Sequence, residues 1–262
     1  MSAGAKVGID SEISSVADVL AVSEAVATSV AVRAHTRLWC RGHAKAGWKL
    51  EPGVYRWPNV KTEGERLRRE RHLTQDFRVF SANLRQGVES DEDIYFLQQH
   101  YRMPTRLLDW TTNPLAALYF ATAEYPDDDG EFFIMDAYQL STTQNASDEF
   151  AGIATSRHPI IRNSVKIISA WVGDAKTFTG HIVPVRPDHF DSRIIRQLGY
   201  FTFHVPKRSA LSAAENKTLK RYKVPAAAKS KLKSQLAVLG VNHFTVYGDL
   251  DHLAEWLKDA HG

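Results

Sequence analysis

The sequence is poor in cysteine and has no long apolar run, and both shortages limit what the protein can be. Cys40 is the only cysteine among 262 residues, so an intrachain disulfide is excluded and a reducing compartment is expected. No stretch of eighteen apolar residues occurs, which predicts that the chain does not span a membrane. The Ala/Val-rich stretch at 13–32 contains acidic residues and lacks a basic leader, so we expect no signal peptide and a cytoplasmic protein.

The common catalytic and metal-binding motifs are also missing. The sequence has no phosphate-binding Gly-rich loop ending in Lys-Ser or Lys-Thr, no Gly-x-Gly-x-x-Gly and no His-Glu-x-x-His. The eleven histidines show no ligand spacing within one predicted element, and one cysteine cannot build a thiolate zinc site. We therefore expect no metal site.

Charge is nearly balanced, with 33 basic and 30 acidic residues and a formal net charge of +3. Basic residues gather in two clusters, at 66–71 and at 217–233. Such runs are usually solvated helix faces, which is the interpretation we favour, and weak phosphate binding is the alternative. Nucleic acid is therefore an open but not a favoured partner.

The remaining composition is that of a globular protein, with 44% hydrophobic residues and a length that can bury a sizeable core. Apolar periodicity and turn residues predict helices near 13–32, 62–83, 91–100, 114–123, 229–239 and 250–258. Strands are expected near 37–42, 107–110, 131–135, 165–168, 181–185 and 199–204, and an irregular surface segment at 139–160. Strands scattered among helices without regular βαβ spacing indicate an α+β fold.

Polar groups concentrate where three predicted strands end. Arg41 lies on the otherwise apolar strand near 37–42, beside Gly42, which permits close approach of backbone or ligand. Its guanidinium either clamps a phosphate or carboxylate or forms a structural salt bridge, for example with Asp109, and the segment alone favours neither.

The second segment, 98–114, contains the densest concentration of polar groups in the sequence. Its polar residues alternate with Tyr101, Leu107, Leu108 and Trp110, which favour burial, so an ordered hydrogen-bond network is expected. The helix opening near Pro114 offers backbone N–H groups to an anion. In the third segment, 191–202, Gln197 either hydrogen-bonds a ligand or belongs to a structural network.

Taken together, these segments resemble the FRG domain family. The matching motifs are Trp39-Cys40-Arg41-Gly42, then Gln-His-Tyr-x-x-Pro-Thr-Arg-Leu-Leu-Asp-Trp-Thr-x-Asn-Pro-x-x-Ala-Leu-x-Phe-Ala from Gln99, then Arg-Ile-x-x-Gln-x-Gly-x-Phe-Thr from Arg193. Cys40 stands where the family has an aromatic residue. The resemblance divides the chain into an N-terminal helical extension, 1–36, and an FRG domain, 37–258.

The motif order is also similar, by analogy, to the ADP-ribosyltransferase fold, a mixed or antiparallel sheet core flanked by helices. That analogy implies NAD as substrate and an ADP-ribosyltransferase or NAD hydrolase, as in bacterial toxins or phage-defence effectors, with an unidentified macromolecular acceptor. Gln197 stands where such enzymes carry a glutamate. The alternatives are a non-catalytic nucleotide- or phosphate-binding module and a nucleic-acid-associated protein. The implied catalytic residues are Arg41, Asp109, Thr111 and Gln197, and the implied nucleotide-binding residues are Arg41, Gly42, His100, Thr105, Arg106, Trp110, Thr112, Asn113 and Arg193.

Overall fold

One mixed β-sheet organises the chain in the computed structural model, which describes residues 10–30, 37–85, 87–88, 90–144, 152–169, 181–187, 195–212 and 216–261. The eight strands follow the order β1-β8-β4-β2-β3-β7-β6-β5. The pairs β1–β8 and β5–β6 are parallel and the other pairs are antiparallel. The α+β fold expected from the sequence is confirmed. The strands are β1 (Ser11–Glu12), β2 (Leu38–His43), β3 (Leu107–Thr111), β4 (Gly130–Asp136), β5 (Ala154–Thr155), β6 (Ile182–Arg186), β7 (Gly199–His204) and β8 (Lys220–Val224).

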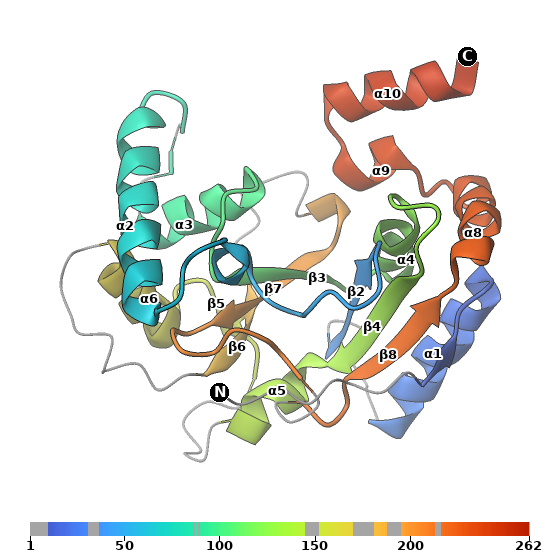
Figure 1. Cartoon of the computed structure of the whole chain (residues 1–262), viewed down its shortest axis with the longest axis horizontal. Helices are drawn as coiled ribbons and strands as arrows, with labels where there is room; N and C mark the ends of the chain where they lie inside the picture. The colour runs from blue at the N-terminus through green and yellow to red at the C-terminus, as the bar shows by residue number, and fades with distance from the viewer. Residues whose placement is uncertain are drawn as a thin grey trace.

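Two groups of helices cover one face of this sheet (Figure 1). Cys40 pairs with Thr111, so Cys40 and Leu107 point to the same face. Cys40 packs in the apolar cluster of α1, α4 and α8, and Leu107 in the cluster of α2, α3 and α6. The helices are α1 (Val16–Ser29), α2 (Glu63–Phe80), α3 (Asp91–His100), α4 (Pro114–Thr122), α5 (Ala137–Gln144), α6 (Pro159–Ser169), α8 (Ala226–Val238), α9 (His243–Tyr247) and α10 (Leu250–His261).

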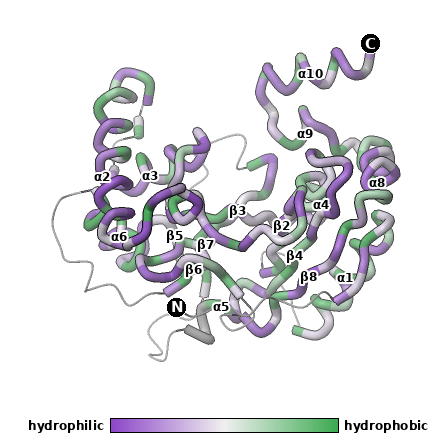
Figure 2. The backbone as a smooth tube through the Cα atoms, viewed as in Figure 1, coloured by the Kyte–Doolittle hydropathy of each residue, from purple (hydrophilic) through white to green (hydrophobic). Residues whose placement is uncertain are grey.

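The opposite face of the sheet buries a third cluster. Trp39, Leu108, Trp110 and Phe133 from the strands pack there against Leu50 and against residues of α5. Hydrophilic residues dominate α2 in Figure 2, and Leu67, Glu70 and Thr74 are its buried side chains. Within the described ranges, every helix is too short or too polar to traverse a lipid bilayer.

The described part of the N-terminal extension belongs to the same core. β1 extends the sheet beside β8, and Val19 and Val26 of α1 are buried with α4 and α8. Ser15 begins α1 with a capping box, because its hydroxyl accepts the Asp18 N–H while the Asp18 carboxylate accepts the Ser15 N–H. Residues 10–30 therefore help to close one end of the sheet.

Three predicted elements require correction. Residues 165–168, expected as a strand, lie in helix α6, whose buried Ile161, Val165 and Ile168 have helical spacing. Residues 139–144, the start of the segment expected to be irregular, lie in helix α5 (Ala137–Gln144). The basic cluster at 217–233 is not one solvated helix face, because residues 220–224 form β8, where Arg221 pairs with Glu131.

Glycine lets α4 lie directly on the sheet. A Cβ on Gly42 would sit 1.9 Å from the carbonyl oxygen of Ala117, and one on Gly130 would sit 2.5 Å from that of Ala121. The backbone of α4 therefore packs against β2 and β4 without intervening side chains. The close approach that we expected at Gly42 is made by the backbone of helix α4. This packing brings both ends of α4 near the polar ends of the strands.

Candidate functional site

The sheet opens between β2 and β3. β2 pairs with β4 along its whole length, whereas in the described strands it pairs with β3 at Cys40 and Thr111 alone. Beyond this pair the strands diverge, and a cleft of about 1010 Å³ lies at the opening. A cleft of this size suits a ligand as large as a dinucleotide.

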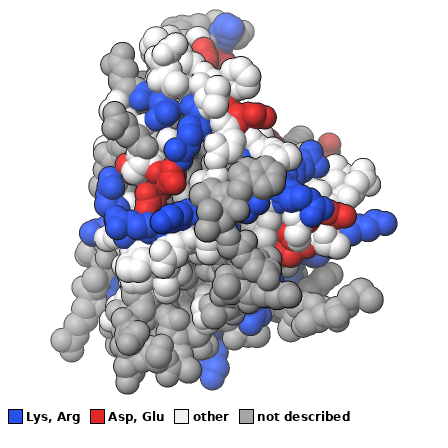
Figure 3. All heavy atoms as spheres, turned by 90° about the vertical axis from the view of Figure 1, so that its left-hand side faces the viewer, with Lys and Arg blue, Asp and Glu red and all other residues white. Residues whose placement is uncertain are grey.

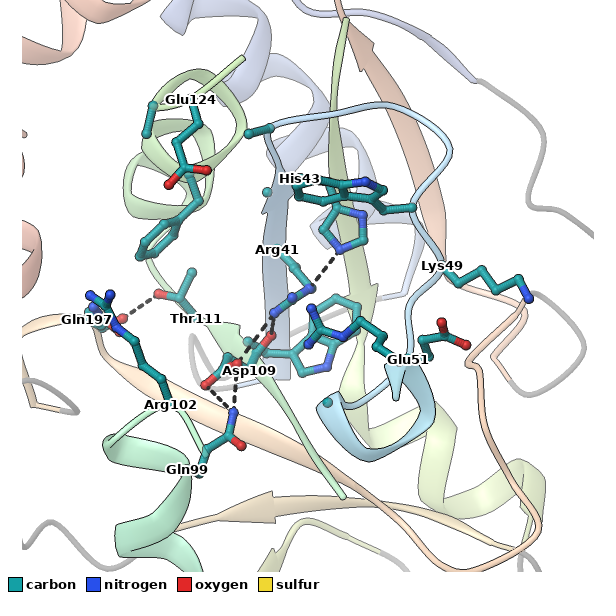
Figure 4. A pocket seen from close by; sticks show the side chains of 18 of the residues that line it. Arg41, His43, Lys49, Glu51, Gln99, Arg102, Asp109, Thr111, Glu124 and Gln197 are labelled. Atoms are coloured by element: carbon teal, nitrogen blue, oxygen red, sulfur yellow. Dashed lines mark hydrogen bonds and ion pairs between the residues drawn. The ribbon is translucent and has the colours of Figure 1, made fainter. Parts of the chain in front are cut away.

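Arg41 stands at the point of divergence (Figure 4). Its Nη1 donates to the backbone carbonyl of Asp109 at 2.6 Å, and its Nε donates to Nε2 of His43 at 3.0 Å. The Asp109 carboxylate lies 3.8 Å from Nη1. Burial lowers the pKa of Arg41 to about 10, Asp109 opposes this effect and Arg56 adds to it. The guanidinium is therefore a cation at neutral pH whose counter-ion is Asp109, so the salt bridge considered in the sequence analysis is present, at the long separation of 3.8 Å.

His43 positions this guanidinium. The imidazole is buried, with its ring edge-on to Phe133 at 5.1 Å. Burial holds the pKa of His43 well below its ordinary value, and the nearby Arg41 and Arg56 lower it further. Neutral His43 can therefore accept the Arg41 N–H, whereas a protonated ring would repel it.

Asp109 is held by a chain of side-chain hydrogen bonds. The amide nitrogen of Gln99 donates to both Asp109 oxygens, at 3.0 and 2.9 Å. The Gln99 oxygen accepts the hydroxyl of buried Thr105, and this bond fixes which way the amide points. The Asp109 side chain remains 58% exposed toward the cleft. Thr105 thus acts from outside the cleft, through Gln99, and not on a ligand.

Thr111 and Gln197 meet at the β3–α4 turn. The Thr111 hydroxyl donates to the Gln197 carbonyl and accepts the Asn113 N–H. The Gln197 amide donates to the Val246 carbonyl at 3.1 Å, which ties α9 to the rim of the cleft. Arg41, Asp109, Thr111 and Gln197, which the sequence analysis grouped, all line the cleft. Their catalytic roles stay a prediction.

The start of α4 is not the open anion site that its sequence suggested. The Asn113 side chain accepts the N–H groups of Leu115 and Ala116 and so caps the helix. Thr112 donates its backbone N–H to the Leu198 carbonyl. Neither Asn113 nor Thr112 lines the cleft.

Arg106 must be withdrawn as a ligand-binding residue. Its side chain is fully buried, with Nε 2.9 Å from a carboxylate oxygen of Glu70 and Nη2 2.7 Å from one of Glu63. Its Nη1 donates to the hydroxyl of Tyr55. Arg106 therefore belongs to a buried charged network with Glu70 and Glu63. Two carboxylates from α2 satisfy this arginine, so no donor faces a ligand.

The other predicted binding residues divide as follows. Gly42 and Trp110 line the cleft, and the Trp110 indole donates to Thr202. The His100 ring lies edge-on to the Tyr101 ring, and His100 does not line the cleft. Arg193 lies outside the described residues.

Several lining residues were not predicted. His43 had a readable signal, because it lies two positions from Arg41 on the same strand face. The segment 48–57, for which neither a helix nor a strand was predicted, contributes Trp48, Arg56 and Trp57 to the lining of the cleft. Glu124, just after α4, stands on the wall across from His43 in Figure 4. Including Lys49, Glu51 and Arg102, the lining has four cationic side chains and three carboxylates.

Comparison with protein families supports the motif analysis. Residues 36–130 match the model of the FRG domain. The chain carries an FRG domain. The matched part of this FRG domain includes every cleft-lining residue except Gln197 and Tyr247. No curated protein and no solved structure matches the chain.

Proposed function

We propose that the cleft of this FRG domain binds NAD and that the protein is an NAD-dependent ADP-ribosyltransferase or NAD hydrolase. The observation that carries the proposal is Arg41, a cation fixed at the split between β2 and β3 by a backbone carbonyl and a neutral imidazole. Such a guanidinium suits a pyrophosphate, because its planar fork can donate to two oxygens at once.

The rest of the cleft suits the other parts of a dinucleotide. Trp48, Trp57, Phe120 and Tyr247 line it with aromatic rings that can stack on nicotinamide or adenine. Asp109 presents an exposed carboxylate beside Arg41, held in place by Gln99. The four cationic groups suit a doubly charged anion, and the three carboxylates provide negative charge for a cation that forms during reaction.

In the proposed reaction, the bond between the nicotinamide nitrogen and the ribose carbon breaks, and nicotinamide leaves with the bonding electrons. The positive charge that develops on the ribose is stabilised by Asp109, in the role that the absent glutamate at position 197 would take. A water or acceptor hydroxyl then forms the new bond to the ribose carbon and loses its proton to a carboxylate of the cleft. A role in toxicity or phage defence remains a prediction from the resemblance.

A non-catalytic nucleotide-binding module is the second candidate. It is favoured by Gln197, whose amide is uncharged and already engaged with the Val246 carbonyl. This module would use the same Arg41 and the same aromatic rings, so the two candidates differ in nicotinamide release and not in binding.

Nucleic-acid binding has less support. On the face shown in Figure 3, acidic groups lie between and beside the bands of basic groups. Arg66 pairs with Glu63, and Lys223 with Glu12 and Asp129. Lys229 is buried and donates to the carbonyls of Ala44, Glu124 and Tyr125. The basic clusters are thus largely used within the fold, which does not favour a phosphate-backbone surface.

The test is to incubate the full chain with labelled NAD and to follow free nicotinamide and labelled macromolecules. We expect release by the wild type and a loss of about 10²–10³-fold in Asp109→Asn, as for removal of a preorganised electrostatic group. Asp76→Asn, on the exposed side of α2, is the matched control. NAD binding without nicotinamide release would instead favour the binding module. Absence of binding at millimolar NAD would overturn the proposed NAD chemistry and leave a module for another nucleotide or phosphate ligand.

A further inference from the structure

The C-terminal helix α10 is weakly anchored by ordinary packing. It projects beside α9 at the upper right of Figure 1. All its described side chains are exposed or half-buried, and a helix of 12 residues is marginal without tertiary support. Its ring contacts are with α9: His252 stacks on Tyr247 at 4.0 Å and Trp256 on Phe244 at 6.3 Å.

Three metal-ligand side chains meet where these helices touch. His243 comes from α9, while His252 and Glu255 lie three residues apart on one face of α10. One ligand atom from each residue lies within 4.8 Å of the others. The Nε2 atom of His243 is 3.6 Å from an oxygen of Glu255, and the two imidazole rings are 4.6 Å apart. Ligands about 2 Å from one zinc ion are roughly 3.3 Å apart, so a small rotamer shift completes this geometry.

Asp249 gives the cluster a second feature of a metal site. Its Oδ1 lies 2.5 Å from Nδ1 of His252 and also accepts the His252 backbone N–H. When Nδ1–H donates a hydrogen bond to a carboxylate, the neutral ring has no proton on Nε2, as in histidines that bind zinc through Nε2. Asp249 thus fixes both the orientation and the tautomer that a metal ligand needs.

We propose that His243, His252 and Glu255 bind a divalent transition-metal ion, with zinc as the best match, and that Asp249 positions His252. Two imidazoles and a carboxylate are ligands that zinc binds, and because the histidines are half-buried and Glu255 is exposed, water can reach a fourth position. The ion joins α10 to α9, whose Tyr247 lines the cleft. This role is structural and does not depend on the reaction proposed for the cleft.

The competing explanation is an exposed ion pair between His243 and Glu255 with no metal. Such a pair contributes little to stability and selects no ion. The two explanations differ in what happens when zinc is added to metal-free protein.

The experiment titrates the chelator-treated full chain with Zn²⁺ by calorimetry and repeats the titration on variants. We expect one tight equivalent in the wild type, lost in a His243→Ala/His252→Ala double variant and kept in His261→Ala, an exposed histidine of the same helix. Asp249→Asn keeps a capping side chain but removes the charge, so it should weaken binding by about 10–100-fold.

Hydrogen exchange on the wild type gives an independent measurement that requires no variant. Zn²⁺ should slow exchange of the amides in α10, and chelator should reverse this. Absence of a stoichiometric zinc equivalent, binding that persists in the double variant, or unchanged exchange in α10 would each overturn the proposal.

Discussion

Arg41 and Arg106 show how environment decides the role of an arginine. Arg106 is fully buried between Glu70 and Glu63, so its charge is neutralised inside the core. Arg41 has a carbonyl and an imidazole as its nearest acceptors, and burial lowers its pKa to about 10. Motif analysis placed both in a ligand site. Local sequence could not separate them, because the carboxylates that satisfy Arg106 come from α2, about 40 residues earlier.

These environments predict losses of stability of very different size. Glu70→Ala leaves Arg106 with one carboxylate fewer in a buried site and should cost about 3–5 kcal/mol of unfolding free energy. Asp109→Asn changes a side chain that is 58% exposed and should cost less than about 1 kcal/mol. Urea unfolding of both variants measures the difference. An Asp109 variant less stable than the Glu70 variant would contradict the assignment of these residues to cleft and core.

At the scale of elements, the contact of α4 with β2 determines the geometry of the cleft. The backbone of α4 at Ala117 and Ala121 packs against Gly42 and Gly130. This contact fixes the position of the whole helix, with Asn113 just before its first residue and Glu124 just after its last turn. The sequence predicted the helix near 114–123, but it did not show which strand the alanines of this helix would meet.

This contact gives a prediction with a matched control. Gly42→Ala would place a Cβ 1.9 Å from the Ala117 oxygen, so it should destabilise the fold by about 1–3 kcal/mol or more. Gly64→Ala, in α2, meets its nearest atom, the end of the Arg68 side chain, at 4.0 Å and should stabilise by about 0.4–1 kcal/mol. Thermal melts of the two variants should move in opposite directions. Equal shifts would show that α4 does not lie directly on β2.

Other elements differ in how well local sequence predicts them. The strand at 199–204 and the helix at 91–100 were predicted at the bounds observed for β7 and α3, because their periodicity and turn signals agree. α6 was mistaken for a strand, because a short apolar run such as Val165–Ile168 fits both periods. β8 was missed because its basic residues find partners on β4 and β1, which no local pattern reveals.

At the scale of the whole molecule, the strand order assembles the site. β2 lies between β4 and β3, although β4 follows β3 in the chain, and the split beside β2 collects residues from Cys40 to Tyr247. Polar strand ends predicted Arg41, Asp109, Thr111 and Gln197 from the sequence. Arg56, Trp57 and Glu124 could not be predicted in the same way, because their place depends on how loops cross the opening.

Buried histidines predict a pH dependence of stability. Burial lowers the pKa of His204 to about 3 and that of His43 well below its ordinary value. The unfolded chain therefore binds more protons than the folded chain below about pH 6.5. Unfolding free energy should fall as pH drops from 6.5 to 5, by up to about 1.4 kcal/mol per pH unit for each such histidine.

Urea unfolding at several pH values measures this slope. His204→Gln removes one buried imidazole and should make the slope shallower, whereas the exposed His72→Gln serves as the control. A wild-type stability that stays level between pH 6.5 and 5 would show that these histidines are not buried as neutral rings.

The central claim is that Arg41 makes the cleft a binding site for a dinucleotide, and calorimetric titration of the full chain with NAD tests it most directly. A charge-assisted hydrogen bond contributes about 1.5–3 kcal/mol, so Arg41→Ala should weaken binding by about 10–150-fold. Arg41→Lys should restore little, because an ammonium lacks the two-pronged geometry, and Arg68→Ala on the exposed side of α2 should bind as the wild type does. Absence of heat at millimolar NAD, or equal affinity in the wild type and Arg41→Ala, would contradict the claim.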